Sequence, residues 1–251
     1  MPTIEETCNI LQQLQCPDDS TRQKAEEQFT AALLQDHSLA PQLLQITLES
    51  SIPNNIKLSA IVNLKRHINK NWYNDDNVNE VIPEISKSMI KENLFLGLST
   101  EDNKIRSNIA SCLATVANFD WPCQFPNFTE KLAAAMKTTD NFNQVDAALK
   151  VLIEFSQDIS SDFLGDFVNT FFQSLAGIII EENRPLMMKQ KAITVFYYAF
   201  MLSSECEEKV KRIMAANVEP CIDLILVILQ GAQGSGDTTT MENPEYYFRV
   251  C

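Results

Sequence analysis

The stretch NNIKLSAIVNLKRHINKNW, residues 54–72, carries the pattern that decides the fold. Within it, the basic residue Lys57 is followed by the small residue Ala60 three positions later and by the large apolar Leu64 at seven. Offsets of three and seven place all three side chains on one side of an α-helix. The stretch therefore predicts an amphipathic helix that packs on its neighbours along one face.

The same pattern occurs in four other segments, whose first positions follow one another at intervals of 35 to 49 residues. Each segment has a long polar or basic residue, then a small or apolar residue, then a large apolar one: Arg22, Ala25 and Phe29; Arg106, Ile109 and Leu113; Gln144, Ala147 and Val151; Lys189, Ala192 and Phe196. A period near forty with two helices per unit is typical of HEAT repeats. The predicted fold is all-α, a HEAT-repeat α-solenoid of about five to six antiparallel helix pairs in a right-handed superhelix.

Turn and capping residues between these segments predict the helix boundaries. Thr3 with Glu6 forms a candidate capping box, and Asn54 or Asn55 is expected to cap the helix that carries Lys57. The expected helices are 3–15, 19–35, 39–51, 54–72, 79–98, 102–119, 127–138, 142–158, 162–182, 185–203 and 206–230. The Gly- and Thr-rich stretch 231–244 is expected to be a flexible loop, and 245–251 the start of a truncated helix. We therefore expect an N-terminal piece of a longer protein.

Composition limits the class of function. The net charge of −13 argues against direct binding to nucleic acid phosphates, and it fits either plain solubility or attraction for basic partners. Only 6 of the 251 residues are glycine, which argues against a β-rich fold. The start lacks an apolar signal core, and the most apolar run, 221–229, is too short to span a membrane, so no membrane insertion is expected.

The sequence offers no catalytic constellation. Its only histidines are His37, expected in a loop, and His67, on the basic helix, and none of its seven cysteines has metal-ligand spacing. The sequence therefore has too few suitably spaced histidines and cysteines to predict a histidine-based triad or a metal site. We expect a binding protein and not an enzyme, with no cofactor and no metal.

The helix at 54–72 also reverses the sign of the overall charge. It contains no acidic residue but carries Lys57, Lys65, Arg66 and Lys70. Asn63, Arg66 and Lys70 are spaced to share the side opposite its apolar stripe. This side is either an ordinary solvated face or a docking patch for an acidic partner surface.

Several stretches resemble the N-terminal region of importin-β-type nuclear transport receptors. They are AEEQFTAALL at 25–34, LLQITLES at 43–50, IKLSAIVNLKRHINKNW at 56–72 and KIRSNIASCLATVANFDWP at 104–122. The family pattern of Leu-Lys-Asn followed by Trp reads here as Leu64-Lys65-Arg66 with Trp72, so Arg66 departs from the usual Asn. ALKVLIEFSQDIS at 148–160 is most similar to the importin nine branch. The resemblance identifies 1–75 as the N-terminal-type domain of the first two repeats, followed by further HEAT repeats over 76–230.

The resemblance implies a receptor that shuttles between cytoplasm and nucleus through the pores of the nuclear envelope. In the family, the inner helices of the first repeats bind the GTP form of the small GTPase Ran, which implies contacts here from Asn63, Lys65, Arg66, Lys70, Asn103, Asn108 and Ser111. Arg106 is instead expected to connect neighbouring repeats. The outer helices bind phenylalanine-glycine repeats of nucleoporins, and the importin nine branch carries basic cargo such as histones. Import and export both remain open, and the alternative is a HEAT-repeat scaffold or regulatory subunit of a non-transport complex.

Overall fold

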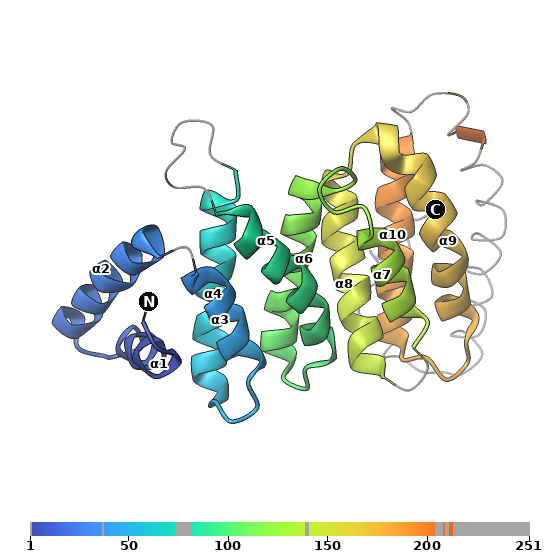
Figure 1. The fold of residues 1–251 in the computed structure, drawn as a ribbon. Helices are drawn as coiled ribbons and strands as arrows, with labels where there is room; N and C mark the ends of the chain where they lie inside the picture. The colour runs from blue at the N-terminus through green and yellow to red at the C-terminus, as the bar shows by residue number, and fades with distance from the viewer. Residues whose placement is uncertain are drawn as a thin grey trace. The chain divides into compact units, whose positions relative to one another are not determined.

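The computed structural model describes residues 2–36, 38–73, 82–138 and 141–203, together with 208 and 211–212. These residues form helices and no strand (Figure 1). The helices are α1 (Ile4–Gln13), α2 (Asp19–Gln35), α3 (Leu39–Leu48), α4 (Asn54–Asn71), α5 (Glu84–Leu94), η2 (Phe95–Ser99), α6 (Asn103–Asp120), α7 (Phe128–Met136), α8 (Phe142–Asp158), η3 (Ser161–Phe163), α9 (Leu164–Ile180) and α10 (Leu186–Ser203). The all-α HEAT-repeat solenoid is confirmed, while the hand of the superhelix stays a prediction.

Local sequence sets most helix starts as expected. The capping box at α1 is present, with Thr3 accepting from the Glu6 amide and Glu6 accepting from the Thr3 amide. Asp18 and Asp102 cap α2 and α6 by accepting hydrogen bonds from backbone amides of the first turn. The predicted range of α4 agrees with the structure, but the predicted cap was wrong, because Pro53 and not Asn54 or Asn55 occupies the N-cap position, with φ of −60°. The proline ring fixes this angle, and no side chain is needed to set the turn.

Helix α5 also differs from expectation. It begins at Glu84 directly after Pro83, and not near residue 79. Its end is followed by the 3-10 helix η2, where Gly97 packs closely against α6 and α3. An added Cβ there would lie 2.6 Å from Ile109 Cδ1 and 3.1 Å from Leu48 Cδ2. Only glycine fits this contact without movement of its neighbours.

The recurring pattern marks the second helix of each pair, α2, α4, α6, α8 and α10, as predicted. All its middle and last residues are buried, none more than 5% exposed. Arg106 does not connect neighbouring repeats as expected. Its guanidinium donates to the carbonyl oxygens of Thr100 (2.6 Å) and Glu101 (2.8 Å), so it closes the turn within its own pair.

Contacts within the chain divide it into two compact units. Unit 1 comprises Met1–Pro126 and Asn141–Ala147, and unit 2 comprises Asn127–Asp140 and Ala148–Cys251. The predicted first domain, 1–75, lies inside unit 1. The predicted loop at 231–244, the truncated helix at 245–251 and His37 lie outside the described residues, as does most of the helix expected at 206–230.

The core of unit 2 is a series of aromatic contacts. Phe155 lies 5.0 Å from Phe128 and 6.2 Å from Phe167, measured between ring centres, and Phe172 of α9 meets Phe196 of α10 at 4.5 Å. The stretch Ser161–Ile180, which contains α9, is long and apolar enough to cross a membrane by length and composition. Eight of the α9 residues are nevertheless buried in the protein, and the helix packs on α7 and α10 as a core helix does.

Candidate partner-binding groove

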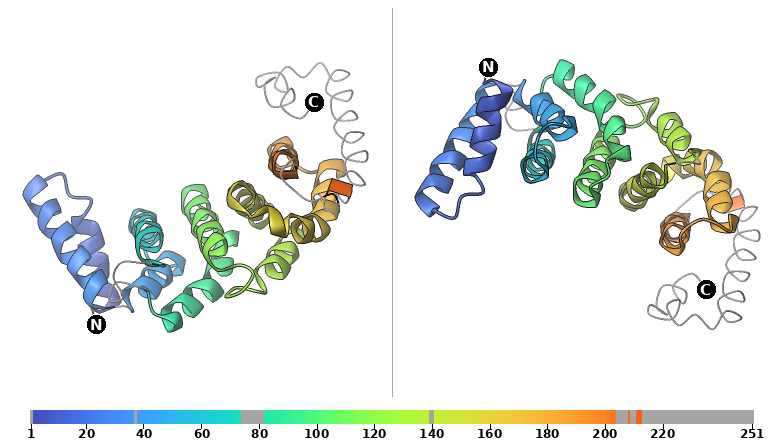
Figure 2. Two further views of the ribbon diagram at one scale, coloured as in Figure 1. Left: turned by 90° about the horizontal axis from the view of Figure 1, so that it is seen from above. Right: turned by 90° about the horizontal axis from the view of Figure 1, so that it is seen from below.

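A groove of about 700 Å³ lies in unit 1 between the first helix pair and α4. Figure 2 shows α2 along its length and α4 nearly end-on, so the two helices cross at a steep angle. Helix α4 packs tightly on α3 and α6, while α2 packs chiefly on α1. The divergence of α2 from α4 opens the groove.

The floor and walls of the groove differ in chemistry. Apolar side chains form much of its lining, including the largely buried Phe29 and Leu33 and the exposed Leu34. The α4 wall contributes Asn63, Arg66 and Lys70. Glu26 of α2 is the one acidic residue among the described lining residues. The groove can therefore take an apolar side chain together with a nearby carboxylate.

The cations of the α4 wall have no counterion in the part of the chain that the structure describes. Arg66 and Lys70 are exposed, and neither has an ion pair or hydrogen bond to any described residue. Asn63 donates from Nδ2 to the Ser59 carbonyl oxygen at 2.8 Å, which leaves its side-chain oxygen to accept a bond from a partner. Two exposed cations beside an apolar floor give a surface complementary to an acidic partner.

Lys65 does not belong to this wall. Successive helical residues are about 100° apart, so Lys65 lies about 160° around α4 from Asn63. It is half-buried and does not line the groove. The structure thus brings together Asn63, Arg66 and Lys70 from the predicted set, but not Lys65.

The α6 candidates lie apart from the groove lining. Asn103 is exposed and accepts from Arg106 Nη2 at 3.2 Å, while the half-buried Asn108 donates to the Lys104 carbonyl oxygen at 2.9 Å. Ser111 is only 4% exposed. A direct partner contact from Ser111 is therefore not available, because its side chain lies within the packed interior.

Sequence reasoning missed the α2 side of the groove. Glu26, Thr30 and Leu34 are spaced by four residues and lie on one face of α2, beside the buried Ala25 and Phe29. This spacing is visible in the sequence, but the solvated side of any amphipathic helix has the same spacing. What makes it a wall is the crossing angle of α2 and α4, which no local pattern encodes.

His67 sits at the base of the groove and has a structural partner. It is 8% exposed, and its Nδ1 lies 3.0 Å from Asn71 Nδ2 on the same helix. Within the described part of the chain, no group of three or more His, Cys, Asp or Glu residues could hold a metal ion.

Comparison with known proteins identifies a family resemblance over this part of the chain. Residues 25–115, which run from within α2 through most of α6, match the family model of the Importin-beta N-terminal domain. The chain is 29% identical over 125 residues to the importin-alpha re-exporter of Schizosaccharomyces pombe, covering 48% of this chain and 13% of that protein. It is 30% identical over 105 residues to Importin-9 of Drosophila melanogaster, covering 40% of this chain and 10% of that protein.

Solved structures show the same fold. A structure titled "Kap95p Binding Induces the Switch Loops of RanGDP to adopt the GTP-bound Conformation" superposes with a TM-score of 0.73 at 16% identity, covering 99% of this chain and 28% of that chain. The resemblance to importin-β-type receptors is confirmed. Re-exporters and Importin-9 match at similar identity, so the importin nine branch stays a prediction.

Proposed function

We propose that this chain is the N-terminal part of a nuclear transport receptor, and that its α2–α4 groove binds the GTP form of Ran. The observation that carries the proposal is the pair of exposed cations, Arg66 and Lys70, which have no ion pair among the described residues and stand on one wall of an apolar groove in a chain of net charge −13. The family match at 25–115 supports the assignment because it includes both walls. The chain spans only 10% to 13% of these two relatives, so the activity of the whole protein is part of the proposal.

The proposed contacts fall into two groups. Arg66 and Lys70 bind carboxylates of the GTPase, and the side-chain oxygen of Asn63 accepts a hydrogen bond. Asn103 and Asn108 extend the contact onto α6, and Lys65 joins only where the partner reaches across α4. We leave Ser111 out because it is buried.

A second surface suits the proposed nucleoporin contact. On α5 and η2, three large apolar side chains are exposed: Ile85 (75%), Met89 (48%) and Leu96 (65%). Phenylalanine-glycine repeats are uncharged and present isolated apolar rings, which such a stripe can take. A structure titled "Kap95:Nup1 complex", with a TM-score of 0.67 at 16% identity, shares the fold.

The net charge of −13 fits basic cargo of the histone type, carried by shuttling between cytoplasm and nucleus. Nucleotide dependence separates this function from a HEAT-repeat scaffold of another complex. We expect the chain to bind Ran loaded with a non-hydrolysable GTP analogue at least about tenfold more tightly than Ran loaded with GDP, a difference of about 1.4 kcal/mol. Isothermal titration of both forms measures it. Equal binding of the two forms, or none, would favour the scaffold.

A further inference from the structure

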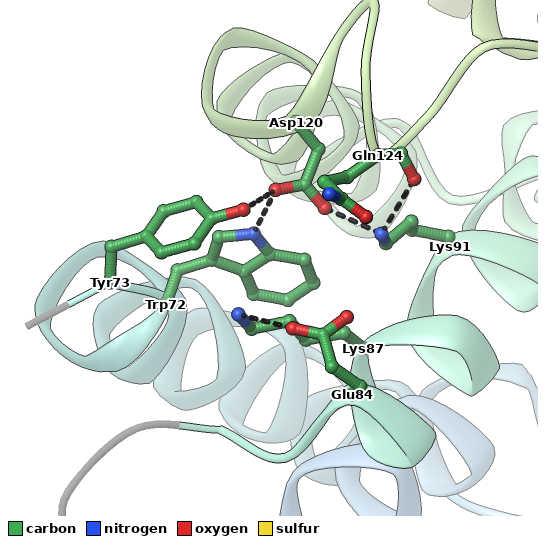
Figure 3. Close-up of polar contacts among 7 residues, drawn as sticks. All are labelled: Trp72, Tyr73, Glu84, Lys87, Lys91, Asp120 and Gln124. Atoms are coloured by element: carbon green, nitrogen blue, oxygen red, sulfur yellow. Dashed lines mark hydrogen bonds and ion pairs between the residues drawn. The ribbon is translucent and has the colours of Figure 1, made fainter. Parts of the chain in front are cut away.

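A buried polar cluster ties the C-terminal end of α4 to the third helix pair (Figure 3). Asp120, the last residue of α6, accepts two hydrogen bonds on Oδ1, from Trp72 Nε1 at 2.9 Å and from the Tyr73 hydroxyl at 2.6 Å. Its Oδ2 forms an ion pair with Lys91 of α5 at 2.6 Å. The Asp120 side chain is completely buried and that of Lys91 is 10% exposed.

Lys91 also binds the loop that follows α6. Its ammonium donates to the Gln124 carbonyl oxygen at 3.0 Å, and the Gln124 amide donates back to the Asp120 carbonyl oxygen at 2.7 Å. Lys91 therefore holds the Asp120 carboxylate, and the Gln124 amide holds its backbone carbonyl. These contacts leave Oδ1 to accept the hydrogen bonds from Trp72 and Tyr73. The buried carboxylate has a counterion and two neutral donors, which is the condition for a charge to be tolerated in the interior.

A second lysine clamps the same end of α4 from the opposite side of the Trp72 ring. The Lys87 side chain is 2% exposed and its ammonium is bound by Glu84 at 3.0 Å. This ammonium lies 4.2 Å from the centre of the Tyr73 ring and 5.4 Å from that of Trp72. Cation–π attraction between this ammonium and the two rings further stabilises the positions of Trp72 and Tyr73.

The cluster is placed to control the docking wall. Trp72 lies two residues beyond Lys70 and six beyond Arg66, at the end of the same continuous helix. A helix moves as a rigid rod over this length, so the hydrogen bonds at Trp72 and Tyr73 set where the two cations stand relative to α2 and α6. Asp120 itself is 2% exposed and cannot touch a partner. Any effect that it has on binding must therefore be indirect, and its hydrogen bonds to Trp72 and Tyr73 lead to the end of α4.

We propose that Asp120, held by Lys91, is a positioning residue for the groove: it fixes the end of α4 so that Arg66 and Lys70 meet the GTPase in register. This inference rests on the proposed binding of Ran in its GTP form. The essential element is the hydrogen-bond acceptor that Asp120 offers to Trp72, and not the buried charge. That distinction makes the proposal testable.

Two double variants separate the acceptor from the charge. Asp120→Asn with Lys91→Met removes both charges but keeps a carbonyl oxygen for Trp72. Asp120→Leu with Lys91→Met removes both charges and the acceptor. Replacing a whole buried ion pair by neutral groups of similar volume is often tolerated, whereas removing one partner is not. Phe155→Leu, in the core of unit 2, serves as a destabilising control that does not touch α4.

Affinity for Ran carrying the GTP analogue is measured by titration, after circular dichroism and thermal melts establish that each variant is folded. We expect the acceptor-keeping pair and the Phe155→Leu control to bind like the wild type. The acceptor-lacking pair should bind about 3- to 10-fold more weakly, the size typical of residues that act through a network. In a Trp121→Phe background, the indole proton of Trp72 reports the bond by NMR, and it should be hydrogen-bonded in the first pair and not in the second.

The outcomes are distinct. If the wild type fails to bind the GTP form, the proposed function itself is wrong. If the wild type binds and the acceptor-lacking pair, folded and without the indole hydrogen bond, binds equally well, Asp120 is only structural and the inference fails. Should that pair not fold, Trp72→Phe removes the same bond from the donor side while keeping an aromatic ring, and wild-type affinity in this folded variant overturns the inference as well.

Discussion

At the scale of single residues, the proposed recognition depends on two side chains, Arg66 and Lys70. Replacing both by Glu changes the charge of the α4 wall by four units and leaves the buried stripe of the helix intact, so the fold should survive. Affinity for Ran in its GTP form should fall by about tenfold or more, because rim and pocket charges of the wrong sign repel the partner. Titration calorimetry measures the loss.

The matched control makes the same change of charge, two cations to two glutamates, outside the groove. Lys24 and Lys137 are both exposed and do not line the groove. The variant with Glu at both positions carries the same net charge as the α4 variant but should keep most of its affinity. Equal loss in both variants would mean that the total charge matters and that the α4 wall does not.

Tyr73 gives a prediction about pH. Burial of its hydroxyl, the hydrogen bond to Asp120 and the nearby charges of Asp120 and Glu84 raise the pKa of Tyr73 above its usual value of 10.0. A raised pKa in the folded state means that the stability from this group is present below the unfolded pKa and is lost as pH rises above it. Urea unfolding just below and just above pH 10 should therefore show a steeper loss of stability in the wild type than in Tyr73→Phe. Parallel losses would show that Tyr73 titrates alike in both states.

At the scale of elements, the contact between η2 and α6 depends on the missing side chain of Gly97. Gly97→Ala should lower the stability of unit 1 by about 1–3 kcal/mol, because the new methyl overlaps Ile109. Ile109→Val removes the Cδ1 atom that lies 2.6 Å from the position of the new methyl, and should restore part of the loss. Trp72 and Trp121, the two tryptophans of the chain, both lie in unit 1, so their fluorescence during urea unfolding reports this unit.

Gly177 of α9 provides the comparison. Apart from its chain neighbours and the backbone of its own helix, no atom lies within 4 Å of the methyl that Gly177→Ala would add, and alanine favours a helix over glycine by about 1 kcal/mol. This variant should not lower the midpoint of urea unfolding followed by far-ultraviolet circular dichroism, which reports the helices of both units. A loss of stability equal to that of Gly97→Ala would contradict the packing argument.

The elements show why sequence predicted so much of this fold. The spacing of Lys57, Ala60 and Leu64 is a local signal of helical period, and it identified every second helix of a pair because each buries the same face. The predicted cap failed at Pro53 and the predicted start failed at Pro83, where the ring of proline and not a capping side chain starts the helix. The helical period of a segment is thus encoded locally, whereas its first residue depends on which of several nearby proline or polar residues ends the preceding loop.

At the scale of the whole molecule, the site could be predicted only in part. The sign reversal along α4 identified Arg66 and Lys70, since charge is visible in sequence. The second wall on α2, the separation of Lys65 from the groove and the burial of Ser111 depend on how helices cross and stack. The bond between Trp72 and Asp120 joins residues 48 positions apart, a separation that no local pattern reveals.

Charge across the whole chain gives the last prediction. The same acidic chain is proposed to bind an acidic GTPase surface through one basic wall and basic cargo through its remaining acidic surface. The Arg66→Glu/Lys70→Glu variant makes the net charge more negative than −13, so the two affinities should move in opposite directions. Binding of Ran in its GTP form should weaken, while binding of a core-histone dimer should be unchanged or tighter, and both wild-type affinities should fall with added salt. Parallel titrations at two salt concentrations measure this. A joint loss of both affinities in the folded variant would mean that the α4 wall serves both partners, and that basic cargo is not held by the acidic surface.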